Sequence, residues 1–392
     1  MSQRPTVKRD FSFGNPTVRA WLYQIIAIVA VLAVVGYLVH NTVINLANRG
    51  ITSGFGFLER NAGFGIVQHL IDYTEGDTYA RVFMVGLTNT LLVSALCIVF
   101  ASILGFAIGL ARLSENWLLR KLSTIYIETF RNIPPLLQIF FWYFAVLRNL
   151  PGPRQALNAF DLAFVSNRGL YIPWPEYAPG TWPFLIALAL SVLASWALFR
   201  FNRKHQLKTG QLRSTWPAAV GLIVLLPLIA HTIFGAATHW DVPELRGFNF
   251  RGGFVMIPEL AALTVALSVY TSSFIAEVIR SGIQSVPHGQ SEAARSLGLP
   301  NPVTMRQVII PQAMRVIIPP LTSQYLNIVK NSSLAAAIGY PDMVSLFAGT
   351  VLNQTGQAIE TIAITMAVYL IISLTISLLM NLYNRKIALV ER

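Results

Sequence analysis

Long apolar blocks alternate with short polar stretches along this chain, and the polar stretches carry most of its charges, glycines and prolines. An α-helix needs about 20 consecutive apolar residues to cross the hydrocarbon core of a bilayer. The pattern therefore predicts eight membrane-spanning helices, at residues 20–44, 82–111, 122–147, 183–201, 216–236, 257–279, 314–335 and 358–383.

The stretches on one side of these segments, at residues 45–80, 148–182 and 237–256, are rich in glycine, proline and aromatic residues and are expected to be loops. Trp174 and Trp182 fall where indole rings favour the headgroup level of a membrane. The segment 336–357 follows Gly339 and Pro341, which end a helix, and its apolar run is too short to span. We expect it to lie on the outer surface or to re-enter the membrane in part.

Composition agrees with this pattern, since 54% of residues are hydrophobic, only 12% are charged, and the mean hydropathy is +0.56. A soluble domain carries about 25% charged residues. The predicted fold class is thus an all-α polytopic membrane protein. The net charge of +12 could suggest nucleic-acid binding, but the basic residues are not gathered on one element, so no nucleic acid is expected. The basic stretch before residue 20 lacks a convincing cleavage site, which favours an uncleaved anchor over a signal peptide.

The distribution of lysine and arginine indicates the orientation. Of 29 such residues, eight fall on one side of the predicted spans and two within them, which leaves 19 on the other side. The eight are Arg49, Arg60, Arg81, Arg148, Arg154, Arg168, Arg246 and Arg251, and the two are Arg131 and Lys330. Cytoplasmic segments carry the excess of positive charge. Both termini and the loop around Glu292 are therefore predicted to be cytoplasmic.

The polar stretch 280–311 contains the sequence EAARSLGLPNPVTMRQVIIP from Glu292 to Pro311. Its alanine-rich start should be helical, and Gly298 stands where a left-handed residue would end the helix. Asn301 is a candidate N-cap with Pro302 at the first helical position, so a second short helix is expected at once. The pattern predicts a compact cytoplasmic projection.

Charges inside the membrane are costly unless they are partnered or hydrated. Glu277 and Arg280 lie near a helix end and are expected to form a surface pair. At a rise of ~1.5 Å per residue, Arg131 lies about 14 Å from the inner surface and Lys330 about 22 Å. Arg131 is either a substrate-binding group or the structural partner of Glu128, three residues earlier, and Lys330 is expected to line a path.

Two proline pairs, Pro134-Pro135 and Pro319-Pro320, interrupt predicted spans, and interrupted helices mark binding sites in several transporters. A packing kink would explain them equally well. The polar residues expected along a substrate path are Thr88, Asn89, Arg131, Asn132, Pro134, Gln138, Ser273, Gln324, Asn327, Lys330 and Asn331.

The sequence lacks the G-x-x-x-x-G-K-[ST] nucleotide motif, and its histidines and single cysteine have no metal-site or triad spacing. No catalytic residue, metal or cofactor is expected in this chain, and any energy must come from a partner.

Four stretches resemble the permeases of ATP-binding-cassette (ABC) importers. Glu292, Ala293, Ala294, Gly298 and Pro311 match their EAA loop, with Val308 and Ile310 in place of isoleucine and leucine. The stretches 86–91 (GLTNTL), 126–134 (YIETFRNIP) and 330–334 (KNSSL) resemble core helices of the amino-acid branch. The extra helices and the N-terminal sequence KRDFSFGNPTVRAWLYQ resemble the permeases of general L-amino-acid uptake systems.

The resemblance implies a type I core of five helices, here with one N-terminal and two inserted helices. Residues 1–81 would hold the N-terminus, the extra helix and a periplasmic loop. Residues 82–385 would form the permease domain, with an insertion at about 148–256 and the coupling loop at 280–311, and residues 386–392 the tail. In the family the five EAA-loop residues bind an ATPase dimer, which holds ATP and Mg²⁺. A second permease subunit, expected to differ from this one, and a periplasmic amino-acid-binding protein complete the assembly in the bacterial inner membrane.

Two alternatives remain at this point. The chain could be a self-sufficient, ion-coupled secondary transporter or channel for small polar solutes, with Arg131 and Lys330 on its path. It could also be a membrane scaffold, although a charged core broken by prolines speaks against that. Transport driven by ATP rather than by an ion gradient would separate the first alternative from a permease that moves L-amino acids of broad range inward.

Overall fold

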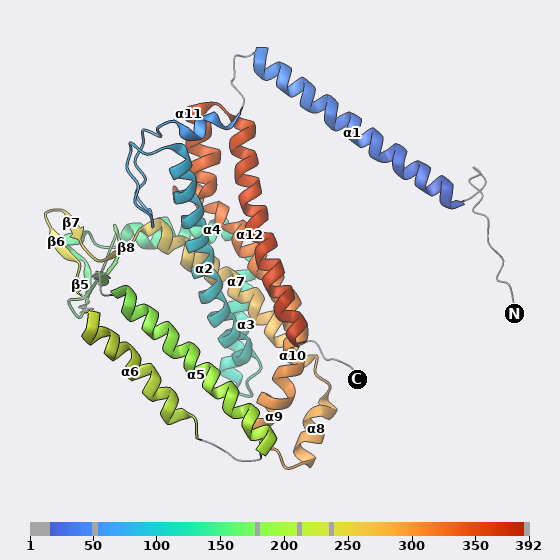
Figure 1. The fold of residues 1–392 in the computed structure, drawn as a ribbon, viewed down its shortest axis with the longest axis vertical. Coiled ribbons are helices and arrows are strands. Elements are labelled where there is room, and N and C mark those ends of the chain that lie inside the picture. The colour runs from blue at the N-terminus through green and yellow to red at the C-terminus, as the bar shows by residue number, and fades with distance from the viewer. Residues whose placement is uncertain (1–15, 49–53, 177–180, 210–213, 235–238, 388–392) are drawn as a thin grey trace. The chain divides into compact units, whose positions relative to one another are not determined.

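Helices dominate the computed structural model, which describes residues 16–48, 54–176, 181–209, 214–234 and 239–387 (Figure 1). Within these ranges six helices are long and apolar enough to cross a membrane. They are α1 (Pro16–Asn48), α2 (Tyr79–Arg112), α5 (Thr181–Thr209), α6 (Trp216–Phe234), α7 (Pro258–Gln284) and α12 (Ala358–Ile387). Six of the eight predicted spans are thereby confirmed as helices of the right length and composition.

The other two predicted spans are not among these six helices, and only one of them is broken. Residues 122–147 form α3 (Trp117–Asn132), α4 (Pro135–Phe140) and one π-helical segment (Phe141–Val146), so a single continuous helix was wrong there. Ile133 and Pro134 are extended, with ψ of 125° and 138°, because the two prolines remove backbone donors and Pro134 disfavours helical geometry before it. In contrast, α10 (Ile310–Ser332) continues through Pro319 and Pro320.

Contacts divide the chain into two compact units. The first, here the rim unit, comprises Met1–Thr88 and Met343–Ile371. Its 3-10 helix (Phe55–Glu59) and following loop fold onto the start of α2, where Asn61 and Thr78 form a β-bridge. The Tyr79 hydroxyl donates to Gln354 Oε1 at 2.8 Å, and Phe83 meets Phe347 edge-on at 5.6 Å between ring centroids.

The segment 336–357, which we expected to lie on the outer surface or to re-enter the membrane in part, is mainly helical. Its part from Met343 onward belongs to the rim unit. Ser333–Ile338 is 3-10 helical and ends at Gly339, whose φ is 79°. Val344–Val351 is π-helical and continues into α11 (Leu352–Thr355). Leu346, Phe347 and Val351 are buried, so the short apolar run is a helix packed within the chain, and its position relative to the membrane stays a prediction.

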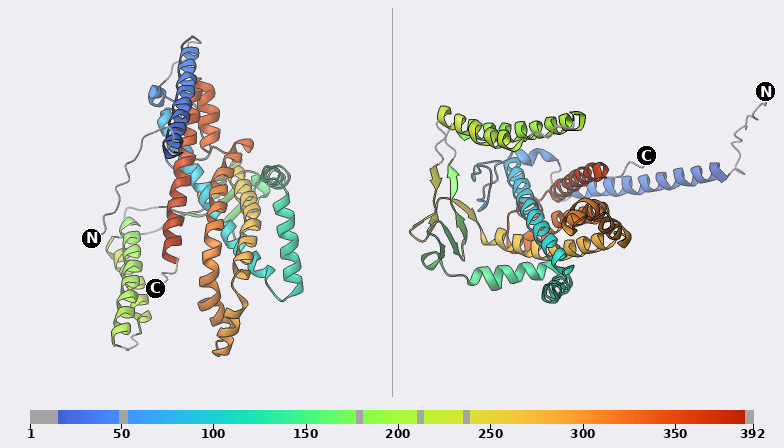
Figure 2. Two further views of the ribbon diagram at one scale, coloured as in Figure 1. Left: turned by 90° about the vertical axis from the view of Figure 1, so that its right-hand side faces the viewer. Right: turned by 90° about the horizontal axis from the view of Figure 1, so that it is seen from below.

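The second unit comprises Asn89–Asp342 and Ile372–Arg392 and is organised around α7. Figure 2 shows α7 running between α3 and α10. Helix α2 approaches α7 closely at Gly105 and Gly109, since a Cβ on Gly105 would lie 2.6 Å from Ile275 Cβ and one on Gly109 2.8 Å from the Ala276 carbonyl. Glycines four residues apart let helix backbones meet in membranes.

The outer stretches that we expected to be loops form eight short strands, which we call the outer β-module. They are β1 (Leu157–Ala159), β2 (Ala163–Ser166), β3 (Gly169–Ile172), β4 (Trp174–Glu176), β5 (His239–Asp241), β6 (Glu244–Arg246), β7 (Asn249–Arg251) and β8 (Phe254–Met256). One antiparallel sheet has the order β1-β2-β3-β8, and β4-β5 and β6-β7 form two further pairs. Because β3 pairs with β8 and β4 with β5, the α5–α6 hairpin is an insertion into this module. Helices α5 and α6 lie side by side (Figures 1 and 2).

Candidate functional site

The stretch around Glu292 forms the expected projection. Helix α8 (His288–Ser296) ends in a Schellman motif, in which the Leu299 amide donates to the Ala294 carbonyl at 3.1 Å and the Gly298 amide to the Arg295 carbonyl at 2.9 Å. Gly298 has a φ of 74°. The left-handed geometry predicted for Gly298 is therefore confirmed.

The second helix of the projection begins one residue earlier than predicted. Asn301 is the first residue of α9 (Asn301–Thr304) and not its N-cap, and Pro300 takes the cap position without a side-chain bond. The Pro300 carbonyl accepts from the Val303 and Thr304 amides, each at 3.0 Å. Helix α9 runs through a π-helical turn (Met305–Ile309) into α10, so Pro311 lies in the first turn of α10. A shift of α9 would be transmitted directly to α10.

Side chains on the projection divide into buried and exposed sets. Ala294 is buried, whereas Glu292, Ala293 and Gly298 are exposed. Leu297 is 79% exposed, which sequence reasoning missed because a leucine next to a glycine stop reads as a packing residue. An exposed leucine at the bend gives the projection an apolar contact point in addition to the exposed Glu292 carboxylate.

A cluster of three charges joins α2 to α7 near the C-terminal ends of both helices. The Glu277 carboxylate forms ion pairs with Arg112 of α2 and Arg280 of α7. The three side chains are only 19–28% exposed. The predicted Glu277–Arg280 contact is confirmed, and Arg112 of α2 adds a helix–helix ion pair that the sequence did not predict.

Arg131 and Glu128 do not form the structural pair that was one interpretation of their spacing. The Arg131 guanidinium lies over the Phe274 ring of α7, 5.1 Å from its centroid, and no ion pair within 4 Å joins it to the described Glu128 side chain. A spacing of three residues places Glu128 and Arg131 at neighbouring positions on α3. The Arg131 guanidinium nevertheless lies on the face of an aromatic ring of α7. Both side chains are exposed on this chain.

Gln138 has a structural role at the break between α3 and α4. It is 4% exposed, and its amide nitrogen donates to the Phe130 carbonyl at 3.0 Å and the Ile133 carbonyl at 2.9 Å. The Phe130 carbonyl is the one that a helical amide at Pro134 would have used. The proline break is thus stabilised by a side chain four residues later.

The other residues predicted along a substrate path differ in whether their polar side-chain groups are already used in hydrogen bonds within the chain. The buried Asn89 amide donates to the Pro341 carbonyl at 2.9 Å, and Ser273 is fully buried and bonded to the Tyr270 carbonyl at 2.6 Å. Those bonded to a backbone carbonyl one turn earlier are Thr88 and Asn132. Exposed or half-exposed on α10 are Gln324, Asn327, Lys330 and Asn331. Arg131, Asn327 and Lys330 therefore keep the most accessible polar groups.

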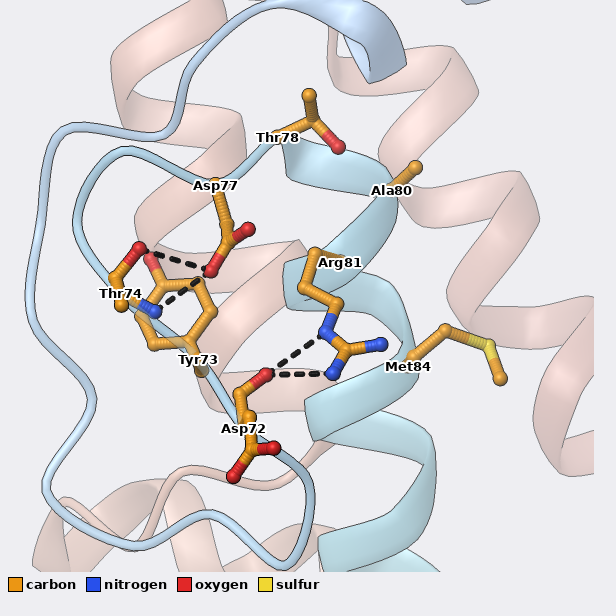
Figure 3. A pocket seen from close by; sticks show the side chains of 8 residues that line it. All are labelled: Asp72, Tyr73, Thr74, Asp77, Thr78, Ala80, Arg81 and Met84. Atoms are coloured by element: carbon orange, nitrogen blue, oxygen red, sulfur yellow. Dashed lines mark hydrogen bonds between the residues drawn. The ribbon is translucent and has the colours of Figure 1, made fainter.

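A pocket of about 560 Å³ opens in the rim unit between the outer loop and α2 (Figure 3). Arg81 donates twice to the Asp72 carbonyl, at 2.7 and 2.8 Å, and Asp77 accepts from the Thr74 amide at 2.7 Å. Burial, and then the charges of Asp77 and Glu75, raise the pKa of Tyr73, whose hydroxyl donates to the Phe64 carbonyl. These bonds hold the pocket wall in place and occupy most of its polar groups.

Within the described ranges, no group of three or more histidine, cysteine, aspartate or glutamate side chains could hold a metal ion. The arrangement offers a two-helix projection, accessible cations on α3 and α10, and a folded outer module.

Comparison with known proteins places these features in a family. Residues 212–388 match the family described as binding-protein-dependent transport system inner membrane component. The chain is 79% identical over 390 residues to a putative amino-acid ABC transporter permease protein, YhdX, of Escherichia coli K12, covering all of this chain and 99% of that protein. It is 51% identical to the general L-amino acid transport system permease protein AapQ of Rhizobium johnstonii, covering 96% and 94%. It is 42% identical to the glutamate/glutamine/aspartate/asparagine transport system permease protein BztB of Rhodobacter capsulatus, covering 95% of each.

Proposed function

The chain belongs to the family of binding-protein-dependent transport system inner membrane components, and from this membership we propose that it is the membrane subunit of an ABC importer for L-amino acids. The similarity to AapQ extends over 96% of this chain and includes the inserted segments. The relatives named above are amino-acid permeases, and one carries four different amino acids by its name. Together these names support a broad range of substrates.

The coupling projection is the observation that carries the mechanism. It is a folded pair of helices with an exposed carboxylate, an exposed leucine and a left-handed glycine bend, and its second helix continues into α10. Because the sequence holds no nucleotide-binding motif, the energy would come from a separate ATPase dimer that binds ATP and Mg²⁺ and presses on this projection. Movement of the projection would reach the core along α10.

The remaining subunits follow from the same proposal. A second permease subunit, different from this one, would complete the transmembrane path. A periplasmic amino-acid-binding protein would deliver the substrate to the outer side. The chain would sit in the bacterial inner membrane with both termini in the cytoplasm, in agreement with the excess of lysine and arginine on that side.

Arg131 and Lys330 would give the path a positive potential that suits the α-carboxylate of every amino acid. A guanidinium can bind a carboxylate through two parallel hydrogen bonds, whereas an ammonium acts as a point charge. Both side chains are exposed on the isolated chain, on helices that pack against α7. This accessibility supports a role toward substrate or the second subunit.

Purification from native membrane, followed by mass spectrometry of the co-purifying chains, tests the assembly. The same complex in proteoliposomes should take up L-amino acids only when the binding protein is outside and ATP reaches the ATPase. Uptake should persist when ionophores abolish ion gradients. Uptake that needs a gradient and no ATP would contradict the proposal and favour a secondary transporter.

A further inference from the structure

Two hairpin tips of the outer β-module each present an exposed phenylalanine. Phe160, between β1 and β2, is 96% exposed, and Phe248, between β6 and β7, is 75% exposed. Neither ring contributes to a core of the described chain. Aromatic side chains are enriched at protein interfaces, so the two tips are candidate contact positions.

The first tip also has strained backbone. Phe160 and Asp161 have φ values of 57° and 56°, a left-handed geometry that is unusual for a phenylalanine. Asn158 holds the turn, because its side-chain oxygen accepts from the Asp161 amide at 2.8 Å and its nitrogen donates to the Asp161 carboxylate. Strained residues cluster at binding sites, where the surrounding structure fixes them. The turn therefore fixes the backbone that carries the exposed Phe160 ring.

The second tip lies beside the first. Arg154 places its guanidinium over the Phe248 ring, 5.0 Å from the centroid. Arg154 and Asp161 line the same cavity of about 420 Å³. Its full lining is Pro153, Arg154, Ala156, Asn158, Asp161, Phe164, Val242, Pro243, Glu244, Leu245 and Phe250. The two aromatic tips thus border a hollow wide enough for one or two side chains.

We propose that this tip surface, made of Arg154, Asn158, Phe160, Asp161, Leu245 and Phe248, docks the periplasmic binding protein, an inference that rests on the proposed function. Aromatic and arginine side chains around a pocket are the composition of energetically dominant positions at protein interfaces. A fixed turn lowers the cost of ordering on association.

The charges on the tip surface favour a protein over a membrane as the occupant. Arg154 is accompanied by the carboxylates of Asp161 and Glu244, and Glu244 pairs with Arg246 at 3.0 Å. Attraction to anionic lipid needs a cluster of basic residues without opposing carboxylates. Alternating charges beside apolar rings instead match a partner surface that has both signs.

The test uses the complete transporter in nanodiscs and the binding protein identified by its co-purification, loaded from a mixture of L-amino acids. ATP hydrolysis is measured against the concentration of binding protein. Phe160→Ala and Phe248→Ala should each raise the half-maximal concentration about tenfold or more, as expected for dominant interface positions. The maximal and basal rates should stay as in the wild type, because the tips are not part of the coupling projection.

Two control variants and a comparison of nanodisc lipids accompany this test. Phe160→Tyr keeps the ring and should keep the wild-type half-maximal concentration, and Trp240→Ala removes an aromatic that is 60% exposed on β5, outside the tip surface, and should do the same. An unchanged half-maximal concentration in both alanine variants overturns the proposal, as does an equal rise in Trp240→Ala. A loss seen only in nanodiscs of anionic lipid would assign the tips to lipid instead. A wild-type complex that no binding protein stimulates would refute the proposed function, a separate result.

Discussion

Gln138 stabilises the turn between α3 and α4 through two bonds from a single amide nitrogen. The Phe130 and Ile133 carbonyls that it satisfies lie beside two prolines, which supply no backbone donors. The side chain is buried at 4% exposure, so water cannot replace it easily. A residue that looked available to substrate is therefore committed to holding the broken helix.

Replacing Gln138 with methionine keeps the volume and removes both donors. Loss of two hydrogen bonds should cost about 0.5–1.5 kcal/mol each, so the purified complex should melt at a lower temperature. Asn132→Ala is the matched control, since Asn132 is exposed and makes one local bond to the Glu128 carbonyl. A Gln138→Met complex that melts together with the Asn132→Ala complex would contradict the structural role.

The observed position of Arg131 allows a prediction about both assembly and uptake, which its spacing from Glu128 alone did not. Arg131→Gln should assemble normally, because no ion pair to Glu128 is lost, and should reduce uptake of several amino acids roughly ten- to a hundredfold, the equivalent of about 1.5–3 kcal/mol. Lys330→Gln should act in the same direction. Initial uptake rates and subunit recovery are measured together, with Arg120→Gln, an exposed arginine of the same helix, as the control.

The double variant Glu128→Gln/Arg131→Gln separates the two explanations of Arg131. It should transport as poorly as Arg131→Gln. Recovery of uptake in the double variant would show that Arg131 serves Glu128 and not the substrate.

At the scale of elements, the coupling projection depends on one backbone conformation. Gly298 closes α8 with a φ of 74°, and a Cβ there would meet no other atom, so a substitution is strained only through its backbone. The bend sets the angle between α8 and α9, and α9 continues into α10. Its geometry therefore concerns coupling more than packing.

Gly298→Val should reach the membrane at normal levels and lose ATPase association or substrate-stimulated hydrolysis. Valine at positive φ costs on the order of 1–3 kcal/mol, which would redirect the bend. Gly289→Val is the control, because Gly289 lies within α8, has open space around it and has no positive φ. Full uptake by Gly298→Val would remove this role.

The charge cluster near the C-terminal ends of α2 and α7 should behave as one unit. Arg112→Gln and Glu277→Gln should each lower the melting temperature of the complex, since each leaves a partly buried charge without its partner. The two losses should not add in the double variant, with a coupling of about 0.5–3 kcal/mol. Additive losses would mean that the two side chains stabilise the helices independently.

At the scale of the whole molecule, the roles proposed for the coupling projection and the outer β-module depend on the orientation of the chain in the membrane. A cysteine at Gln206, an exposed residue near the C-terminal end of α5, should resist an impermeant thiol reagent in intact spheroplasts and react after lysis. A cysteine at Arg246, in the outer β-module, should react without lysis. Both are made in a Cys97→Ala background, since Cys97 is the only cysteine. The reverse pattern would invert the topology.

The sequence alone determined the membrane class, six of the eight predicted spans and the left-handed glycine. These depend on local properties, because a span needs only an unbroken apolar run and a helix stop only a residue tolerant of positive φ. The proline pair Pro134-Pro135 was also visible in the sequence, but the sequence did not show that it divides the predicted span into two helices.

Only the tertiary structure decided which distant groups meet. Arg112 and Glu277 form an ion pair although they are 165 residues apart in the sequence. The Arg131 guanidinium lies over the Phe274 ring of α7 and does not pair with the Glu128 carboxylate on its own helix. The outer β-module escaped prediction because its strands have three or four residues and because β3 pairs with β8 across the whole α5–α6 insertion. Runs that short have no readable period, and a long-range pairing depends on the packing of both segments, which no local pattern records.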